Sequence, residues 1–506
     1  ILNGKIRYDK PILIYWLMSV PMRLWDVNEF SARFPAAMAG SVTVLLVFIM
    51  GLRMGLSISA ARMAAFTILC SGLPLVISKA ATTDAVLCFT VVLAMLLYWE
   101  QRKFGFSWWK HILFWVSLGL STLVKGPPGL AVVGLAILAD QFFIWRTNRK
   151  SPLVQSTSLS VRTVRLTTGI LVFLVVVMPW VYAAWQRTGG EFFFQSVGKH
   201  VFKRSLISFE GHGGPFFYYL VLLPLLIFPM TAPLLTTLRW AWLRRKSSPA
   251  LRFLFCWFLP GLILFSLVRT KLPHYMAPLI PPLALLVGHW WDALKTSEMN
   301  LTPFWWRAGA VMMALFGLAA LIAIPLVVWL YSLQEKLGIA GAALALILCL
   351  SLWWGSVFWW KYRASLAVGI WAVGFYICIL SGLFFVLPSI EPLRPAKPLG
   401  QWIYTHAPAG TLLMAVDFQE PSLMFYSKSH MLEMGKRDIM EAMNNLNHIE
   451  SASALVISRD LWEKWVKDFS QPLHPQVSVR FQGQFFLFHK GYWMEILIVG
   501  NWHPPE

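Results

Sequence analysis

Basic side chains at the edges of apolar runs are the residues of this sequence whose types and spacing could do chemistry. Lys10 stands directly ahead of "PILIYW", Lys125 follows "LSTLV", and Arg269 and Lys271 follow "LILFSLV". Arg offers a phosphate a bidentate fork and Lys offers it a point charge, so bases at headgroup depth could bind an anionic lipid. The alternative is that each base extends its charged head from an apolar stem to ordinary lipid headgroups.

Asp84 is the acidic residue that lies closest to apolar sequence. In "KAATTDAVLCF" it begins an apolar segment, where a titratable group at membrane depth is a candidate for a functional role. We interpret it as a carboxylate that orients a sugar or a nearby base. The alternative is an acid favoured by the dipole at a helix N-terminus, with Thr82 or Thr83 as the N-cap.

The segment 186–215 carries His200, Lys203 and Arg204. Asp9 and His200 could share a divalent ion, zinc or magnesium, because both residue types bind zinc and Asp also suits harder cations. Two ligands from distant segments are equally typical of ordinary solvated residues, so both interpretations stay open.

Membrane helices are the elements that must position these residues. The 506 residues are 58% hydrophobic and 13% charged, a balance that excludes a soluble globular protein. Pairs of Trp flank many apolar runs and are typical of anchors at the membrane interface. Residues 12–24 are too short to span and predict a helix lying along the interface. Twelve spans are predicted, at 34–54, 60–78, 82–99, 108–124, 127–146, 165–185, 216–238, 250–268, 275–293, 305–332, 337–358 and 365–388.

The net charge of +20 is explained by topology. Most Lys and Arg fall in alternate loops, the pattern of cytoplasmic loops in membrane proteins, so no nucleic-acid partner is required. The candidate bases Lys10, Lys125, Arg269 and Lys271 fall on the opposite, external side, together with both ends of the chain. Because they run against the usual distribution of charge, they need another reason to be there.

The tail beyond residue 388 changes character. "SIEPLRPAKPLG" is typical of a Pro-rich linker, and five β-like runs then alternate with three amphipathic segments. We therefore predict an α-helical polytopic membrane protein with an external α/β domain. Its parts are residues 1–33 with the interfacial helix, a transmembrane domain over 34–388, and the α/β domain over 389–506.

Several segments appear in an order that resembles a known family. They are "LNGKIRYDKPILIYWLM", "NEFSARFPAAMAG", "ATTDAVL", "STLVKGPPGL" and "RTKLPHYMAPLIPPLAL". Together they resemble the bacterial lipid-carrier-dependent glycosyltransferases of the protein O-mannosyltransferase and aminoarabinose (lipid A) transferase family. The resemblance implies a GT-C fold with one more span than predicted here and a periplasmic C-terminal domain. It also implies an inverting transfer of a sugar from undecaprenyl phosphate to lipid A or to a protein hydroxyl.

The resemblance also implies roles for single basic residues. Lys10 and Lys125 match lysines that contact the carrier phosphate. Either Lys203 or Arg204 matches a basic position in the long loop. Arg269 and Lys271 are added as phosphate-binding candidates because of their place at the end of a span.

The resemblance implies roles for acidic residues, a tyrosine and a histidine as well. Asp84 matches a second essential acid, and Tyr275 resembles a tyrosine near the donor. Asp9 stands where the transferase has a Glu bound to a metal ion, and His200 matches that ion's other ligand. The family's catalytic Asp lies upstream of the segment matching 2–11, so we expect an N-terminally truncated chain without it, whose activity is then in question.

Two further readings of the sequence compete with a transferase of the bacterial inner membrane. A multi-span lipid or sugar transporter without transferase activity predicts charges near mid-membrane and an internal repeat, whereas the ionisable residues here fall at the ends of predicted spans. A noncatalytic membrane protein leaves the external bases unexplained. No P-loop or HExxH motif occurs, so the sequence gives no support to a nucleotide-sugar donor.

Overall fold

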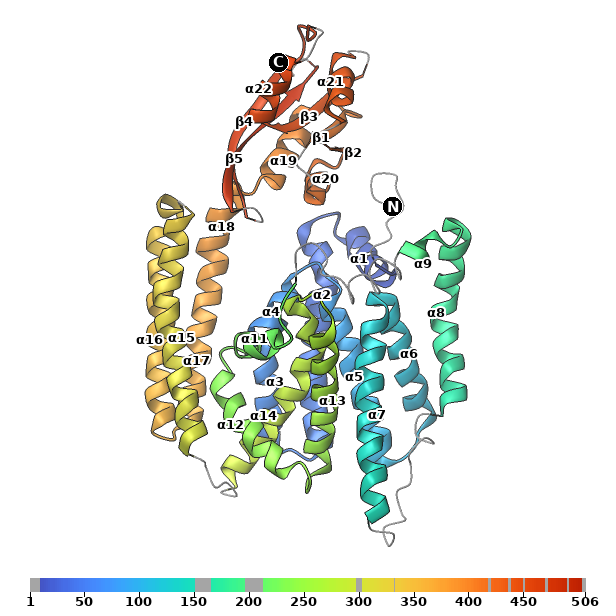
Figure 1. Ribbon diagram of the computed structural model, residues 1–506, viewed down its shortest axis with the longest axis vertical. Helices are drawn as coiled ribbons and strands as arrows, with labels where there is room; N and C mark the ends of the chain where they lie inside the picture. The colour runs from blue at the N-terminus through green and yellow to red at the C-terminus, as the bar shows by residue number, and fades with distance from the viewer. Residues whose placement is uncertain are drawn as a thin grey trace. The chain divides into compact units, whose positions relative to one another are not determined.

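The computed structural model describes residues 10–150, 165–195, 213–296, 303–331, 333–416, 420–435, 438–448, 451–468, 472–488 and 491–502. Contacts divide the chain into two compact units (Figure 1). The first unit combines Arg7–Phe316 with Ser351–Phe375, and the second combines Gly317–Leu350 with Tyr376–Glu506. The predicted boundaries at residues 33 and 388 were placed on composition and on the predicted elements, not on contacts, and they stay predictions.

Membrane-spanning helices dominate the described part of the chain. By length and composition, eight of its helices could cross a membrane, and a ninth is added if the bent pair α3 (Ile58–Cys70) and α4 (Gly72–Lys79), at 59° to each other, is one span. The eight are α2 (Glu29–Met54), α5 (Asp84–Phe104), α7 (Pro127–Lys150), α8 (Leu166–Thr188), α13 (Pro249–Leu267), α15 (Pro303–Leu330), α16 (Gln334–Trp360) and α17 (Ala364–Ser381), which continues to Leu393 through η5 (Gly382–Val386), α18 (Leu387–Ile390) and η6 (Glu391–Leu393).

By length and composition alone, the described residues therefore contain eight or nine candidate spans where the sequence predicts twelve. Three predicted spans are broken or shortened, and α6 (Trp108–Lys125) does not pass the same test. Residues 216–238 form α11 (Tyr218–Leu226) and α12 (Thr231–Arg244), and residues 275–293 form the 3-10 helix η4 (Pro273–Leu279) and α14 (Ile280–Lys295). The last two stretches each contain several prolines, and proline lacks the N–H that a continuous helix needs.

The helix predicted over 12–24 is present as α1 (Leu13–Leu24), and its place at the membrane interface stays a prediction. It exposes large apolar side chains, among them Trp16 at 52% and Leu24 at 67%. The chain then turns at Asn28, whose side-chain oxygen accepts a hydrogen bond from the Ser31 N–H and caps α2. This turn places α1 against α2 and α6.

Helix α5 lies at the centre of the first unit. It is apolar on all sides, as a helix surrounded by other helices must be, and 89% of its apolar stretch is buried. It packs against α2, α6 and α7. Because α5 begins at Asp84, this packing holds the carboxylate in the interior at one end of the bundle.

The tryptophans divide between surface and interior, whereas the sequence led us to interpret most of them as interfacial anchors. Trp108 and Trp109 are exposed, but Trp290, Trp306 and Trp359 are fully buried in the first unit. The Trp306 and Trp359 rings stack with centroids 4.2 Å apart, and each indole N–H donates to the other residue's carbonyl. A buried indole finds a hydrogen-bond partner in this way without water.

The second unit contains the predicted α/β domain. Its five-stranded sheet has the order β2-β1-β3-β5-β4, where β1, β2 and β3 are parallel and β4 and β5 form an antiparallel pair. Alternate side chains of β1 and β3 enter the cores on the two faces, which α19 and α20 cover on one side and α21 and α22 on the other. The strands are β1 (Leu412–Val416), β2 (Met431–Met434), β3 (Ser453–Ser458), β4 (Ser478–Leu487) and β5 (Tyr492–Gly500), and the helices are α19 (Ala396–His406), α20 (Pro421–Ser427), α21 (Ile439–Asn447) and α22 (Arg459–Asp468).

The domain differs from its prediction in three places. The two runs predicted over 477–482 and 484–490 are the single strand β4, and the short elements β2 and α20 were not predicted. The predicted Pro-rich linker is mostly helical, as α18, η6 and the start of α19. Proline is tolerated in the first turn of a helix, where its missing N–H has no partner to lose.

Candidate functional site

An ion pair joins the beginning of α5 to the end of α6. The Lys125 Nζ donates to Asp84 Oδ1 at 2.5 Å, and the same Nζ lies 5.0 Å from the centroid of the Tyr275 ring in η4. Asp84 is 5% exposed, and the Lys125 side chain 17%. The structure thus brings together three of the predicted site residues from three separate segments.

Local sequence explains why α6 ends at Lys125. Gly126 follows it with φ of 79°, a conformation that side chains with a Cβ rarely adopt, and Pro127 begins α7. The sharp reversal between α6 and α7 holds the lysine at the end of the bundle, next to the beginning of α5.

The alternative interpretation of Asp84 holds in part, because the acid lies in the first turn of α5, but the expected N-cap bond from Thr82 or Thr83 is absent among the described residues. Thr83 precedes α5 with helical dihedral angles and makes no side-chain cap bond. The hydroxyl oxygens of Thr82 and Thr83 are buried, and neither has a hydrogen-bond partner within the described ranges. Among the described residues, the one hydrogen bond to the Asp84 carboxylate is that from Lys125, so Oδ2 remains for another partner.

The segment that carries Tyr275 is held on both sides. Thr270 forms an antiparallel bridge with Gly213, and the buried Tyr219 hydroxyl exchanges hydrogen bonds of 3.2 Å with the backbone N–H and C=O of Leu272. These contacts place the start of η4, and with it the Tyr275 ring, beside Lys125. Tyr219 was not singled out in the sequence, where it is one aromatic residue in an apolar run.

Lys271 has a different place from the one predicted. Its ammonium donates to the carbonyls of Phe265, Ser266 and Val268 at 2.5 to 3.1 Å, which caps the C-terminus of α13. Burial lowers the pKa of Lys271. Because three carbonyls occupy its three donors, we leave Lys271 out of the proposed phosphate site.

The other candidates lie at the surface or outside the described residues. Lys10 is exposed at the bend before α1, and the Arg269 side chain is also exposed. Asp9, His200, Lys203 and Arg204 lie outside the described residues, so their predicted roles stay predictions. Across the part of the chain that is described, no group of three or more His, Cys, Asp or Glu is placed to hold a metal ion.

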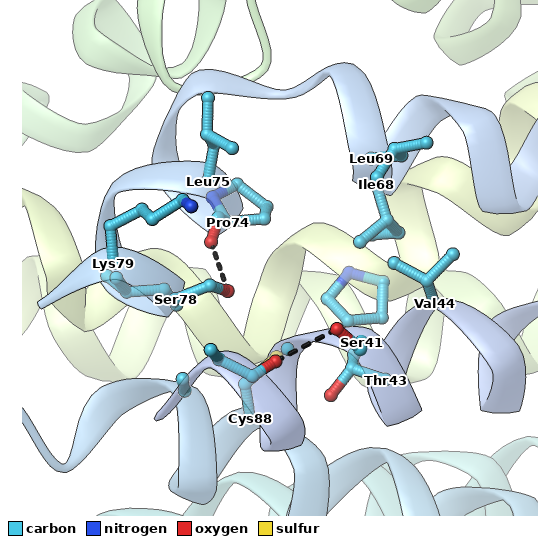
Figure 2. A pocket seen from close by; sticks show the side chains of 15 residues that line it. Ser41, Thr43, Val44, Ile68, Leu69, Pro74, Leu75, Ser78, Lys79 and Cys88 are labelled. Carbon is cyan, nitrogen blue, oxygen red and sulfur yellow. Dashed lines mark hydrogen bonds between the residues drawn. The ribbon is translucent and has the colours of Figure 1, made fainter. Parts of the chain in front are cut away.

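A cavity of about 180 Å³ lies between α2, α3, α4, α5 and the start of α14 (Figure 2). Ala85 and Cys88 of α5 line it, so its wall begins one residue from Asp84. Lys79 at the end of α4 lines it as well, and its side chain runs back toward Pro74 (Figure 2). Lys79 is not among the predicted site residues, since nothing in its local sequence predicts the cavity.

A multi-pass membrane protein with a C-terminal α/β domain is the class that this fold defines. Two solved structures share it: ArnT from Cupriavidus metallidurans bound to undecaprenyl phosphate, with a TM-score of 0.77, and the same protein in the apo state, with a TM-score of 0.76. Each is 19% identical in sequence and covers 99% of this chain and 89% of the other. At this identity the likeness establishes the fold.

Sequence comparison points to the same group of proteins. The family model described as dolichyl-phosphate-mannose-protein mannosyltransferase matches residues 3–188. The undecaprenyl phosphate-alpha-4-amino-4-deoxy-L-arabinose arabinosyl transferase of Serratia proteamaculans is 26% identical over 64% of this chain and 56% of its own length. The corresponding proteins are 30% identical over 56% and 49% for Pseudomonas aeruginosa, and 28% over 89% and 70% for Pseudomonas fluorescens.

These comparisons confirm the predicted resemblance to lipid-carrier-dependent glycosyltransferases of the GT-C class. The chain spans about half the length of the first relatives that it matches, 56% and 49%. Fold and resemblance are therefore established, whereas activity, substrates and partners are matters for proposal.

Proposed function

We propose that this chain belongs to an integral membrane glycosyltransferase that takes its sugar from a polyprenyl phosphate donor such as undecaprenyl phosphate. The observation that carries the proposal is the buried pair of Asp84 and Lys125 beside Tyr275 at one end of the bundle. Its relatives are named as transferases of an undecaprenyl phosphate-linked sugar, which supports the same donor class.

The reaction breaks the bond between the anomeric carbon of the sugar and a phosphate oxygen. The electron pair of that bond stays on the oxygen, so the leaving polyprenyl phosphate gains negative charge. The Lys125 ammonium keeps two further donors after its bond to Asp84, and Lys10 offers a second cation at the same end of the unit. Cations placed where this charge develops stabilise the transition state.

Asp84 acts on the reaction through its two oxygens. Oδ1 fixes the direction of the Lys125 ammonium, and Oδ2 is left to accept a hydrogen bond from the sugar or the acceptor. An acceptor that attacks from the face opposite the phosphate inverts the anomeric carbon. A lipid phosphate is already a nucleophile and needs little base, whereas a Ser or Thr hydroxyl must lose a proton to one.

The proposal extends to the acceptor and the compartment. We infer a lipid phosphate, such as that of lipid A, as acceptor, with a protein hydroxyl as second choice. The site and the α/β domain would face the periplasm from the inner membrane. A divalent ion at Asp9 and His200 is retained as part of the proposal, and no step above depends on it.

Mass spectrometry of the products tests this function. Lipid A and periplasmic proteins are compared from cells with the gene, without it, and with the gene restored. We expect one acceptor to gain the mass of a sugar residue only when the gene is present. In reconstituted membranes the same protein should release free polyprenyl phosphate as the sugar is transferred.

A matched pair of variants ties the result to the site. Lys125→Gln should reduce turnover at least about 100-fold, the usual effect of losing one transition-state charge contact. Arg187→Gln removes an exposed base at the end of α8 and should leave turnover unchanged. If instead the donor lipid only changes leaflet and no sugar reaches an acceptor, the protein is a transporter and the transferase proposal is wrong.

A further inference from the structure

We infer that the cavity between α2, α3, α4 and α5 holds a segment of an acyl chain of the acceptor lipid, and that Lys79 contacts the phosphate of that lipid. The inference rests on the proposed function for the identity of the lipid as acceptor. Its physical basis is the cavity itself, which nothing else in the described residues explains.

The size and lining of the cavity suit hydrocarbon. Its volume of about 180 Å³ is close to that of an engineered apolar cavity that takes benzene, so it would hold on the order of six carbon atoms. Apolar side chains, among them Val44, Ile68 and Leu75, form much of its wall. The occupant is therefore part of a chain and not a whole lipid.

The hydroxyl groups that line the cavity already donate hydrogen bonds within their own helices. Ser41 donates to the Ala37 carbonyl at 3.0 Å, and Ser78 donates to the Pro74 carbonyl at 2.6 Å. Thr43 donates likewise within α2, at 2.7 Å. Each hydroxyl donates its single hydrogen bond to a carbonyl of its own helix, so no hydroxyl donor is left for a ligand.

Lys79 gives the cavity a charged rim. The side chain is exposed, and no carboxylate pairs with it among the described residues. Lys79 is itself one of the residues that line the cavity, and Figure 2 shows its side chain extending from the end of α4 in the direction of Pro74. An ammonium at the mouth of a hydrocarbon slot is complementary to a lipid with a phosphate head.

The position of the cavity favours the acceptor over the donor. The transferase needs two amphiphiles at one place, and Lys125 on α6 is proposed for the donor phosphate. Lys125 does not line the cavity, whereas Ala85 and Cys88 on α5 do. A chain held there brings its lipid to Asp84 from the α4 side, and a second cation, Lys79, is available on that side.

Photo-crosslinking in reconstituted membranes tests the inference without any transfer. The full chain is irradiated in nanodiscs that contain phosphatidic acid with a diazirine on one acyl chain. We expect label in peptides that carry residues lining the cavity, at 37–44, 68–69, 74–79, 85–88 or 281. Lipid A should compete for the site, whereas undecaprenyl phosphate and phosphatidylcholine should not.

Two variants and their controls make the result specific. Val44→Phe fills the slot, and Leu45→Phe adds a ring at a neighbouring position that is 54% exposed and does not line it. Lys79→Gln should lower the label about tenfold, as the loss of a charge-assisted contact does, and Lys79→Arg should restore it. Arg187→Gln should have no effect.

Each remaining outcome overturns a distinct statement. Label outside these peptides, or equal label in Val44→Phe and Leu45→Phe, means that the cavity takes no chain. Competition by undecaprenyl phosphate means that it serves the donor and not the acceptor. Correct labelling in a protein that transfers no sugar would leave the chain site standing and refute the proposed function.

Discussion

At the scale of single residues, the pair formed by Asp84 and Lys125 has both a structural and a chemical meaning. The two charges are largely shielded from water, with side chains 7% and 17% exposed. Removing one partner of such a pair leaves the other buried without compensation, at a cost of about 3–5 kcal/mol. Removing both partners costs far less, because no charge is left behind.

This asymmetry gives a prediction that separates structure from function. Asp84→Asn and Lys125→Gln should each lower the free energy of unfolding by about 3 kcal/mol, whereas the double variant should recover most of that loss. Turnover should be lost in all three. Thermal unfolding in detergent measures the first quantity, and transfer from a polyprenyl phosphate donor measures the second. A double variant that regains turnover would make the pair purely structural.

Lys271 allows a second prediction at this scale. Lys271→Met leaves the carbonyls of Phe265, Ser266 and Val268 without their donor and frees the segment that positions Tyr275. We expect a stability loss of about 1–3 kcal/mol, typical of buried groups left unsatisfied, and a weaker apparent affinity for the donor. Arg269→Met, at an exposed neighbour, is the control for stability. Equal stability of the two variants would contradict the capping role.

At the scale of elements, α5 carries two polar networks at its two ends. Asp84 begins it, and near its other end Tyr98 donates to Asp140 Oδ2 of α7 at 2.9 Å, while Arg102 lies 3.2 Å from the same oxygen. Asp140 is fully buried within α7. This corrects the expectation that ionisable residues fall only at span ends, and it shows how α5 is locked against α7.

The lock can be tested by removing its acid. Asp140→Leu leaves the Arg102 guanidinium without its anion in the interior, and we expect a loss of about 3–5 kcal/mol in the free energy of unfolding. The control is Glu463→Gln, which breaks an exposed pair with Arg459 in α22 and should leave the free energy of unfolding almost unchanged. Thermal unfolding of both variants decides the matter, and similar losses would show that the Asp140 network does not stabilise the bundle.

At the scale of the whole molecule, the second unit joins membrane helices to the sheet. The Tyr331 ring, at the end of α15, lies 5.4 Å from Phe486 of β4, and the Trp493 indole donates to the Tyr331 carbonyl at 3.3 Å. Val328 and Leu337 belong to the same buried cluster as Phe486. The turn between α15 and α16 is thus anchored to the hairpin of β4 and β5.

Hydrogen exchange tests this anchor. Tyr331→Ala removes an aromatic pair worth about 0.5–1.5 kcal/mol, so amides over 485–493 should exchange up to about tenfold faster. The exchange rates of amides in β1 and β3 should be unchanged, because side chains of these strands pack in two other hydrophobic clusters. Tyr404→Ala, at a tyrosine 56% exposed in α19, is the control and should leave the hairpin unaffected. Faster exchange throughout the sheet would mean that the anchor holds the entire domain.

The sequence by itself determined the properties that depend on neighbours along the chain. Hydropathy and the periodicity of apolar residues predicted the membrane helices and the sheet domain. They also predicted that Asp84 begins a helix, because these properties follow from local composition. Prolines within apolar runs also carried a signal, which the count of twelve spans did not use.

Only the tertiary structure decided which distant residues meet. Lys125 and Lys271 both follow apolar runs, yet one pairs with Asp84 and the other is held by carbonyls. Trp359 and Trp360 are adjacent, yet one is fully buried and the other 47% exposed. Helix packing causes these differences, because it determines which side chains contact each other. Contacts between residues far apart in the chain leave no signal in the local sequence.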